Sequence, residues 1–356
     1  MNFEFEQITS RKNPKIIRAC SLADKKYRDR EGLFAFEGEK LFGEALREGV
    51  RITEVFFTKR AAENCEQLIN EAYNLGAAAY LVTEEVYEKL TYEKASQGIF
   101  AVARKWELEE FSKDSDDSQG YIMLESVRDP SNVGAILRSC AALGSSNILL
   151  SEDCADIFGY KTLRAAMGAA FKANIVITHD TEKSIKILKE RGNVYAAALT
   201  DSAQSIAETE FSACDSIIIG NEGHGVSDKV LENCSGAVII PMQCGSESLN
   251  ASVAAAILIW ERARRTTGFY GAPCKCGRTA HGKDGDCRRT KYYLRYGFRR
   301  PFPAEASTEK DLLKSTEASA GYTSLVPKAI WASEYCRMQI QWKGFWIKIL
   351  QKLRIY

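Results

Sequence analysis

Short apolar segments recur between residues 121 and 268, and their rhythm limits the fold of this sequence more than any other feature. The segments expected to be strands are 121–127, 147–152, 173–178, 194–199, 216–220 and 237–242. Most are apolar throughout, which is typical of strands buried on both faces of a parallel sheet. Helical patterns lie between them at 132–143, 161–171, 181–191, 227–234 and 248–265. This alternation predicts an α/β domain built on a parallel sheet.

Residues 1–106 predict a smaller α/β domain. One expected helix begins at Pro14, and two others cover 38–49 and 64–76. The expected strands are 52–58, 78–82 and 98–105. Residues 107–120 are acidic and rich in serine, and they hold almost no apolar residue after Phe111. We interpret them as a solvated linker. The expected organisation is therefore a domain at 1–106, a linker at 107–120, a second domain at 121–268 and a tail at 269–356.

Three loops of the second domain carry groups that are suited to chemistry. In the first loop, Asp129 begins a turn, Ser131 or Asn132 is expected to cap the next helix, and Gly134 permits close approach of other backbone. Arg138 follows four residues later on the same helix face. A helix N-terminus with an Asn and an Arg beside it suits a phosphate. A capped helix with a surface arginine explains this loop equally well.

The second loop follows a strand that ends at Gly220, and Gly223 and Gly225 come soon after it. Such a glycine cluster indicates positive φ angles or close approach of a ligand. Glu222 lies among these glycines, either as a hydrogen-bonding carboxylate of the loop or as a catalytic group. The glycine spacing differs from the dinucleotide-binding fingerprint, and the sequence also lacks a P-loop, which disfavours other nucleotide-dependent α/β enzymes.

The third loop leads from Pro241 into a long helix that Ser248 or a neighbour is expected to cap. One apolar stripe runs along this helix, and it predicts a face buried in the core. The stripe consists of Leu249, Val253, Ile257 and Trp260.

All three loops follow strands, so we expect them to meet at the carboxyl ends of one sheet, where open α/β folds bind ligands. The site then offers Asn, Ser and backbone N–H groups with one Arg and one Glu, and no His or Cys forms a base–nucleophile pair. His179 and His224 are isolated, and we interpret them as incidental. Such a site is suited to group transfer by positioning rather than by covalent catalysis.

Three segments, taken in order, resemble the motifs of the SpoU or TrmH-type RNA ribose 2′-O-methyltransferases: NVGAILRS (132–139), IIIGNEGHGVS (217–227) and IPMQCGSESLNASVAAAIL (240–258). Residues 1–106, through NPKI and FAFEGEKLFGEAL, are similar to the L30e-like substrate-binding domain that precedes the catalytic domain in many members. The resemblance implies a SPOUT fold, in which the parallel sheet carries a trefoil knot. It also implies S-adenosylmethionine as the cofactor and a homodimer with sites at its interface.

The resemblance assigns roles to eight residues of this sequence. The cofactor contacts, largely through the backbone, fall to Gly220, Ile240 and Leu249. The catalytic pocket is assigned to Asn132, Arg138, Glu222, Ser248 and Asn250. Because a guanidinium keeps its proton up to a pKa above about 12, we interpret Arg138 as a group that orients phosphate and polarises the 2′-OH, and the proton acceptor stays open. The family often has glycine two residues after the Met, where Cys244 stands here before Gly245.

The activity implied is methyl transfer from S-adenosylmethionine to a ribose 2′-OH of structured RNA. The expected target is 23S rRNA, with tRNA as the alternative. A non-catalytic RNA-binding or ribosome-assembly factor is the competing class, and it is disfavoured because all five pocket residues are present. No metal ion is expected in the site, since no cysteine of residues 1–268 has a CxxC neighbour.

The net charge of +1 averages two unlike parts. Residues 270–356 hold 17 Lys and Arg against 7 Asp and Glu, so the rest of the chain is acidic. An acidic body needs a local basic patch to hold RNA, and residues 11–30, with eight basic and two acidic side chains, are the best candidate. The expected RNA-binding residues are Arg11, Lys12, Lys15, Arg18, Lys25, Lys26 and Arg28. An ordinary solvated helix face is the alternative interpretation.

The tail contains four potential ligands in CKCGRTAHGKDGDC (274–287), but their CxC spacing differs from that of usual zinc sites. Its basic and aromatic segments 288–302 and 340–356 suit RNA or a membrane surface. A disordered extension, or sequence read out of frame, explains the tail better.

The sequence shows neither a secretory signal nor an apolar run long enough to span a bilayer. Eleven cysteines, most of those in the body within apolar or helical runs, fit free thiols in a reducing compartment. We therefore expect a cytoplasmic protein that does not bind a membrane.

Overall fold

A parallel sheet organises the carboxyl-terminal part of the described chain. The computed structural model describes residues 5–116, 118–243 and 248–266. The sheet has seven strands in the order β10-β12-β9-β11-β6-β7-β8, and all its strand pairs are parallel. Its strands are β6 (Ile122–Leu124), β7 (Asn147–Ser151), β8 (Asn174–Thr178), β9 (Val194–Ala197), β10 (Gln204–Ser205), β11 (Ser216–Ile219) and β12 (Gly236–Ile239).

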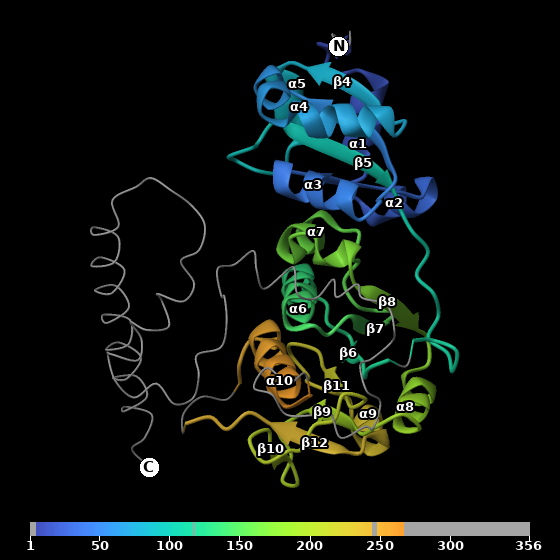
Figure 1. The fold of residues 1–356 in the computed structure, drawn as a ribbon, viewed down its shortest axis with the longest axis vertical. Helices are drawn as coiled ribbons and strands as arrows, with labels where there is room; N and C mark the ends of the chain where they lie inside the picture. The colour runs from blue at the N-terminus through green and yellow to red at the C-terminus, as the bar shows by residue number, and fades with distance from the viewer. Residues whose placement is uncertain (1–4, 117, 244–247, 267–356) are drawn as a thin grey trace, which may run out of the picture. The chain divides into compact units, whose positions relative to one another are not determined.

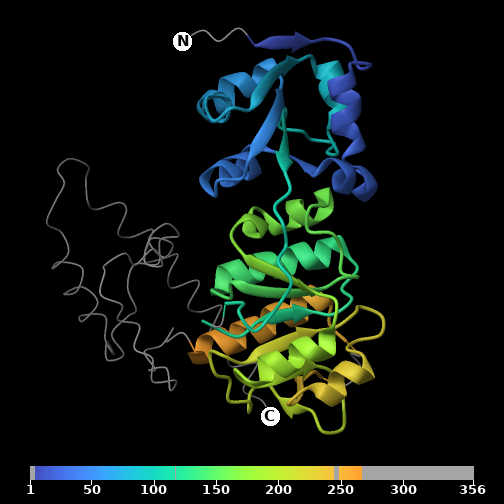
Figure 2. The same cartoon turned by 90° about the vertical axis from the view of Figure 1, so that its right-hand side faces the viewer.

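Helices cover both faces of this sheet (Figures 1 and 2). They are α6 (Pro130–Leu143), α7 (Tyr160–Ala166), the short 3₁₀ helix η1 (Ala169–Phe171), α8 (Thr181–Lys189), α9 (Asp228–Asn233) and α10 (Ala251–Thr266). Ile122 and Leu124 of β6 belong to the core formed with α6 and α10, whereas Tyr121 and Met123 belong to the core formed with α8 and α9. Successive residues of β6 are thus buried on opposite faces, which explains its continuously apolar sequence.

A second, mixed sheet of five strands in the order β1-β4-β3-β5-β2 forms the amino-terminal part. Its strands are β1 (Glu6–Ile8), β2 (Leu33–Glu37), β3 (Ile52–Phe57), β4 (Ala78–Val82) and β5 (Ile99–Arg104). Its helices are α1 (Pro14–Ser21), α2 (Lys25–Glu31), α3 (Glu39–Arg47), α4 (Lys59–Asn74) and α5 (Glu84–Leu90). Asn13 caps α1 through a 2.9 Å bond from the N–H of Lys15, with Pro14 at the first helical position, as the sequence predicts.

The segment interpreted as a solvated linker is in part a structural element, so that interpretation is wrong for its first residues. Phe111 is 5% exposed and packs edge-on against Tyr121, with ring centroids 5.1 Å apart. Its N–H donates to the carbonyl of Ile177 at 2.8 Å, beside β8. Arg191 donates to the carbonyl oxygen of Lys113 at 2.8 Å and stacks on Phe111. One aromatic side chain, with the backbone bonds beside it, is enough to fix the acidic segment against the sheet.

Three of the four residues of the apolar stripe predicted to face the core on α10 instead face outward, and only Ile257 packs against the core. Val253 is 47% exposed, Trp260 41% and Leu249, just before the helix, 37%. The buried face is formed by Ala255, Leu258, Ile259 and Ala263, which pack toward α6 and the sheet. The helix carries apolar residues on more than one face, so its period alone does not reveal which face is inside.

Among the residues that the structure describes, none of the helices combines the length and the apolar character needed to cross a membrane. The tail from 269 onward, with its Cys and His residues and basic segments, lies outside the described residues, as do Cys244 and Gly245.

Candidate functional site

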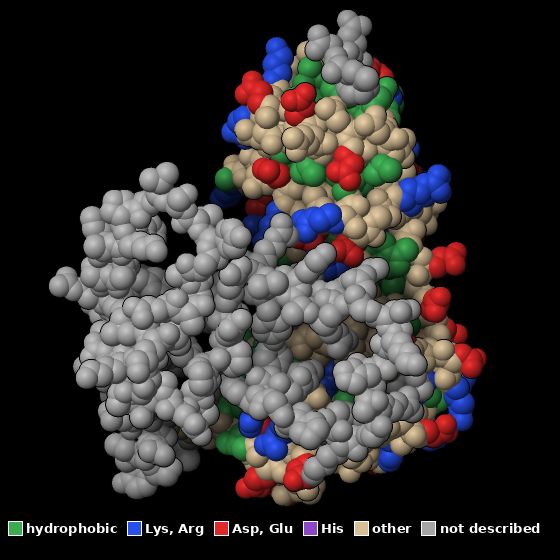
Figure 3. All heavy atoms as spheres, in the orientation of Figure 1, with side chains coloured by type: hydrophobic (Ala, Val, Ile, Leu, Met, Phe, Trp, Pro, Cys, Tyr) green, Lys and Arg blue, Asp and Glu red, His purple; other side chains and the backbone are tan. Residues whose placement is uncertain are grey.

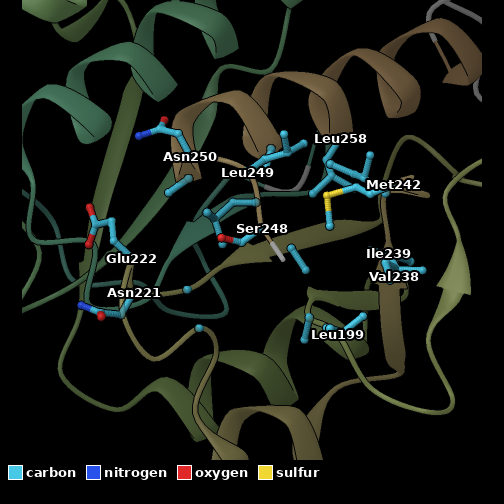
Figure 4. A pocket seen from close by; sticks show the side chains of 18 of the residues that line it. Leu199, Asn221, Glu222, Val238, Ile239, Met242, Ser248, Leu249, Asn250 and Leu258 are labelled. Carbon is cyan, nitrogen blue, oxygen red and sulfur yellow. The ribbon is translucent and has the colours of Figure 1, made fainter. Parts of the chain in front are cut away.

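A cavity of about 520 Å³ opens where the loops after β9, β11 and β12 come together. Figure 4 shows Asn221, Glu222 and Asn250 on one side of it and Leu199, Val238, Ile239 and Met242 on the other. The cavity therefore has a polar end and an apolar end. Of the predicted site residues, those that line it are Gly220, Glu222, Ile240, Ser248, Leu249 and Asn250.

Glu222 ties the second loop to the first. Its Oε1 accepts hydrogen bonds from the Asp129 N–H at 3.1 Å and from Asn132 Nδ2 at 2.9 Å. Its Oε2 accepts from the Arg128 N–H at 3.3 Å. The carboxylate is thus used as an acceptor for the start of α6, and it is not poised as an unengaged base.

Hydrogen bonding keeps Glu222 ionised. Burial by itself raises the pKa of this carboxyl, but the bonds from Asn132 and from backbone N–H groups outweigh burial, and the pKa is lowered. A carboxyl with a lowered pKa is ionised at neutral pH and accepts hydrogen bonds there.

Asn132 and Asn250 continue the connection to the third loop. Asn132 is 6% exposed, and its Oδ1 accepts from Asn250 Nδ2 at 3.0 Å. Asn250 Oδ1 in turn accepts from the N–H of Ser252 at 2.9 Å and so caps α10. The chain Glu222–Asn132–Asn250 therefore joins all three loops, and we call it the loop network.

The cap of α6 differs from the prediction. Asp129, and not Ser131 or Asn132, is the N-cap, with its Oδ1 accepting from the Ser131 N–H at 2.6 Å and Pro130 at the first helical position. Because Asp129 satisfies this helix end, the side chain of Asn132 is available for the loop network.

The glycines of the motifs serve the protein's own packing. A Cβ at Gly134 would lie 2.4 Å from the carbonyl oxygen of Thr162, so this glycine lets α6 and α7 approach closely. A Cβ at Gly220 would lie 2.3 Å from the N atom of Val226, where the loop folds back on itself. Gly225 has φ +70° and exchanges two backbone hydrogen bonds with Asn221. Close approach of a ligand is not needed to explain these positions.

Arg138 lies apart from the loop network. It is exposed on α6, it does not line the cavity, and within the described part of the chain its guanidinium has no hydrogen-bond or ion-pair partner. No Lys, Arg or His lines the cavity among the described residues. One chain alone therefore does not bring the predicted arginine to the predicted pocket.

Sequence reasoning missed Asn221 and Ser126. Asn221 Nδ2 donates to the Ser126 carbonyl oxygen at 2.8 Å, and its Oδ1 accepts from the N–H of Gly223 at 2.8 Å. Ser126 has φ +55°, which is uncommon for a residue other than glycine. The signal for Asn221 was its place between Gly220 and Glu222, where a side chain that stabilises a turn is favoured.

The basic stretch 11–30 is partly neutralised by the protein itself. Arg28 is 5% exposed and bonds Asp156 at 2.7 Å, so the expectation that it contacts RNA is wrong. Lys15 pairs with Glu6 at 2.7 Å, and Arg18 pairs with Glu54. Exposed residues without such pairs in the described structure are Arg11, Lys12, Lys25 and Lys26. On the face drawn in Figure 3, basic and acidic side chains are interspersed rather than gathered by sign.

Both parts of the described chain match known families. Residues 119–260 match the SpoU rRNA methylase family, and residues 13–101 match the MRM3-like substrate-binding domain. The 23S rRNA (guanosine(2553)-2′-O)-methyltransferase RlmP of Bacillus subtilis is 32% identical over 258 residues, which cover 72% of this chain and 98% of that protein. The tRNA (guanosine(18)-2′-O)-methyltransferase of Thermus thermophilus is 36% identical over 156 residues, covering 43% and 79%.

Solved structures agree with these matches. The AdoMet-bound rRNA methyltransferase of Sinorhizobium meliloti superposes with a TM-score of 0.66 at 27% identity, covering 74% of this chain and 98% of that one. The fold is that of the SPOUT methyltransferases, as the three motifs indicated. With the loop network, the cavity and these matches together, the chain belongs to the SpoU rRNA methylase family of RNA methyltransferases.

Proposed function

We propose that this enzyme transfers a methyl group from S-adenosylmethionine to a ribose 2′-OH of 23S rRNA. The observation that carries the proposal is the cavity at the carboxyl edge of the sheet, whose polar end is built by the loop network. The Bacillus subtilis relative, which this chain covers over 98% of its length, is named for the same reaction on 23S rRNA. tRNA is the second candidate substrate, because the Thermus thermophilus relative is named for tRNA.

The residues of the cavity fit the cofactor. S-adenosylmethionine supplies an electrophilic methyl group, together with polar groups and an apolar thioether region. Gly220, Ile240 and Leu249 are proposed to hold it, since all three line the cavity. Asn250 and Ser248 present polar groups at the opposite end from Met242 (Figure 4). An ionised Glu222 fixes the loop beside them and does not itself need to touch the reacting atoms.

The catalytic role of Arg138 requires a second chain in this proposal. Its guanidinium is exposed and unpaired in the described structure, and none of the described residues that line the cavity is a cation. A homodimer in which the arginine of one chain approaches the cavity of the other supplies what is missing. The exposed apolar residues Leu249 and Val253, beside the cavity and on α10, offer a surface for that contact.

RNA is proposed to contact the amino-terminal part through the exposed residues Arg11, Lys12, Lys25 and Lys26. A cytoplasmic location is proposed with this substrate, because the Bacillus subtilis relative is a bacterial rRNA methyltransferase.

Purified protein with tritiated S-adenosylmethionine tests the proposal when 23S rRNA and bulk tRNA are offered separately. We expect label in 23S rRNA and little in tRNA, and no label from the Arg138→Ala variant. Preferential labelling of tRNA selects the second candidate, and labelling of neither RNA contradicts the proposal.

A further inference from the structure

A second hollow lies away from the cofactor cavity, at the carboxyl end of α3. This hollow, which we call the junction groove, has a volume of about 520 Å³. It is lined by residues that follow α3, by residues at and after the end of β5, and by residues of η1 and the segment after it, namely Glu48, Gly49, Val50, Arg51, Arg104, Lys105, Trp106, Ala170, Phe171 and Ala173.

Two arginines stand side by side at this groove. Arg51 precedes β3 and Arg104 ends β5, and the Arg104 N–H donates to the Arg51 carbonyl oxygen at 2.9 Å. Both side chains are exposed, and in the described structure neither guanidinium has a hydrogen-bond or ion-pair partner. Two neighbouring like charges repel each other, so an unpaired pair of this kind favours an anion between them.

The nearby carboxylates are already engaged. Glu48, the acidic residue among those that line the groove, lies 3.7 Å from Lys172 Nζ. Asp29 lies 2.6 Å from Lys105 Nζ. Because these carboxylates have their own cations, Arg51 and Arg104 remain as uncompensated positive charge at the groove.

Trp106 gives the groove an aromatic wall that is held in place. Its ring packs edge-on against three phenylalanines, with centroid distances of 4.5 Å to Phe158, 5.7 Å to Phe34 and 6.1 Å to Phe171. The side chain is half-buried and still lines the groove. A rigid aromatic ring beside unpaired arginines is the combination with which proteins hold unpaired nucleotides.

We propose that the junction groove binds an unpaired segment of the substrate RNA, with a phosphate between Arg51 and Arg104 and a base against Trp106. This inference rests on the proposed RNA substrate and adds a binding surface that lies outside residues 11–30. It also brings residues from both parts of the described chain to the RNA, since Phe171 ends η1, between β7 and β8 of the seven-stranded sheet, and Arg51 directly precedes β3 of the five-stranded sheet.

The test measures binding of the full chain to a 23S rRNA transcript over a series of salt concentrations. The double variant Arg51→Ala/Arg104→Ala is expected to raise the Kd about tenfold and to reduce the slope of log Kd against log salt by about 1.4, as two lost phosphate contacts on a single strand imply. The variant Arg51→Lys/Arg104→Lys keeps the charge and is expected to recover most of the slope. Lys183→Ala/Lys186→Ala removes two exposed charges of α8 whose ammonium groups have no ion-pair partner in the described part of the chain, and it is the matched control.

A second readout does not depend on affinity. A transcript that contains 4-thiouridine, irradiated in complex with the wild-type chain, is expected to crosslink to the peptide that holds Trp106. The proposal is overturned if the double alanine variant has the same Kd and salt slope as the control. It is also overturned if crosslinks are confined to other peptides. Methylation by the wild-type chain is measured in parallel, so failure of the groove with methylation intact is distinguished from failure of the proposed function.

Discussion

The loop network and the outer side of α6 and α10 differ in whether one chain completes them. In the network, Glu222, Asn132 and Asn250 satisfy one another within 3.1 Å, and Asp129 and Asn250 cap the two helices concerned. On the outer side, Arg138 has no partner in the described structure and Val253 leaves 47% of its surface exposed. The difference teaches that one chain organises the proposed cofactor pocket by itself, whereas the proposed catalytic arginine lies outside that pocket.

Replacing Arg138 is expected to have the largest effect. Arg138→Ala should lower kcat/KM for methyl transfer by about 10²-fold or more, because a charge that stabilises the transition state is lost. Cofactor affinity and thermal stability should stay near wild type, since this side chain is exposed and unpaired. Methylation kinetics and calorimetric cofactor binding measure the two effects.

Mixing variants sharpens that result. If sites are shared between chains, coexpressed Arg138→Ala and Asn250→Ala chains, each inactive alone, should recover about a quarter of wild-type activity through mixed dimers with one intact site. No recovery would place Arg138 and Asn250 of the same chain in one site.

A charge on the outer face of α10 is expected to weaken the proposed homodimer. Val253→Asp should weaken self-association at least tenfold, because burying a valine is worth about 1.5–3 kcal/mol and an aspartate opposes burial. Sedimentation velocity measures this, with Lys186→Ala on α8 as a surface control. A wild-type chain that sediments as a monomer at micromolar concentration would contradict the interpretation of the outward apolar face as a self-association surface.

A substitution in the loop network is expected to have a smaller effect than the changes at Arg138 and Val253. Glu222→Gln keeps the shape of the side chain but turns an amide N–H toward groups that donate, so about 1–3 kcal/mol of stability is lost. Cofactor affinity should fall about tenfold as the loops loosen. Thermal unfolding and calorimetry follow both. An unchanged affinity would show that the loops hold their positions without this carboxylate.

Acid should reduce the stability that the Glu222 carboxylate gives to the wild-type chain. The pKa of Glu222 is lowered in the fold, so its stabilisation is fully present above the usual pKa of about 4.3 and is lost as pH falls through the lowered folded value. The difference in Tm between wild type and Glu222→Gln should therefore be constant near pH 7 and shrink below about pH 4. A difference that grows in acid would mean that the carboxyl is neutral in the fold.

The apolar segments predicted the parallel sheet well because buried parallel strands have little choice of composition. The segments 147–152 and 216–220 became β7 and β11, and 173–178 became β8. The order of the strands in the sheet could not be predicted from these segments, because β9 lies between β11 and β12 through contacts that no local pattern encodes. The knot implied by the family resemblance could not be predicted from local patterns either, because periodicity carries no information on how the chain is threaded.

The site was predictable in its residue types but not in its details. Asp129, Ser131 and Asn132 are all able to cap a helix, and the local sequence does not show that Asp129 takes this place while Asn132 contacts Glu222. The outward face of α10 escaped prediction because this helix carries apolar residues on its exposed face as well as on its buried face. Phe111 was a usable signal, as a single aromatic residue in an acidic segment.

The position of the transferred methyl group tests the central claim most directly. After incubation with tritiated S-adenosylmethionine, labelled 23S rRNA is digested with alkali, which spares the bond next to a 2′-O-methylated ribose. The account predicts that the label stays in an alkali-resistant dinucleotide and yields one 2′-O-methylated nucleoside on full enzymatic digestion. Label recovered in a base-methylated nucleoside, or in the protein, would contradict it.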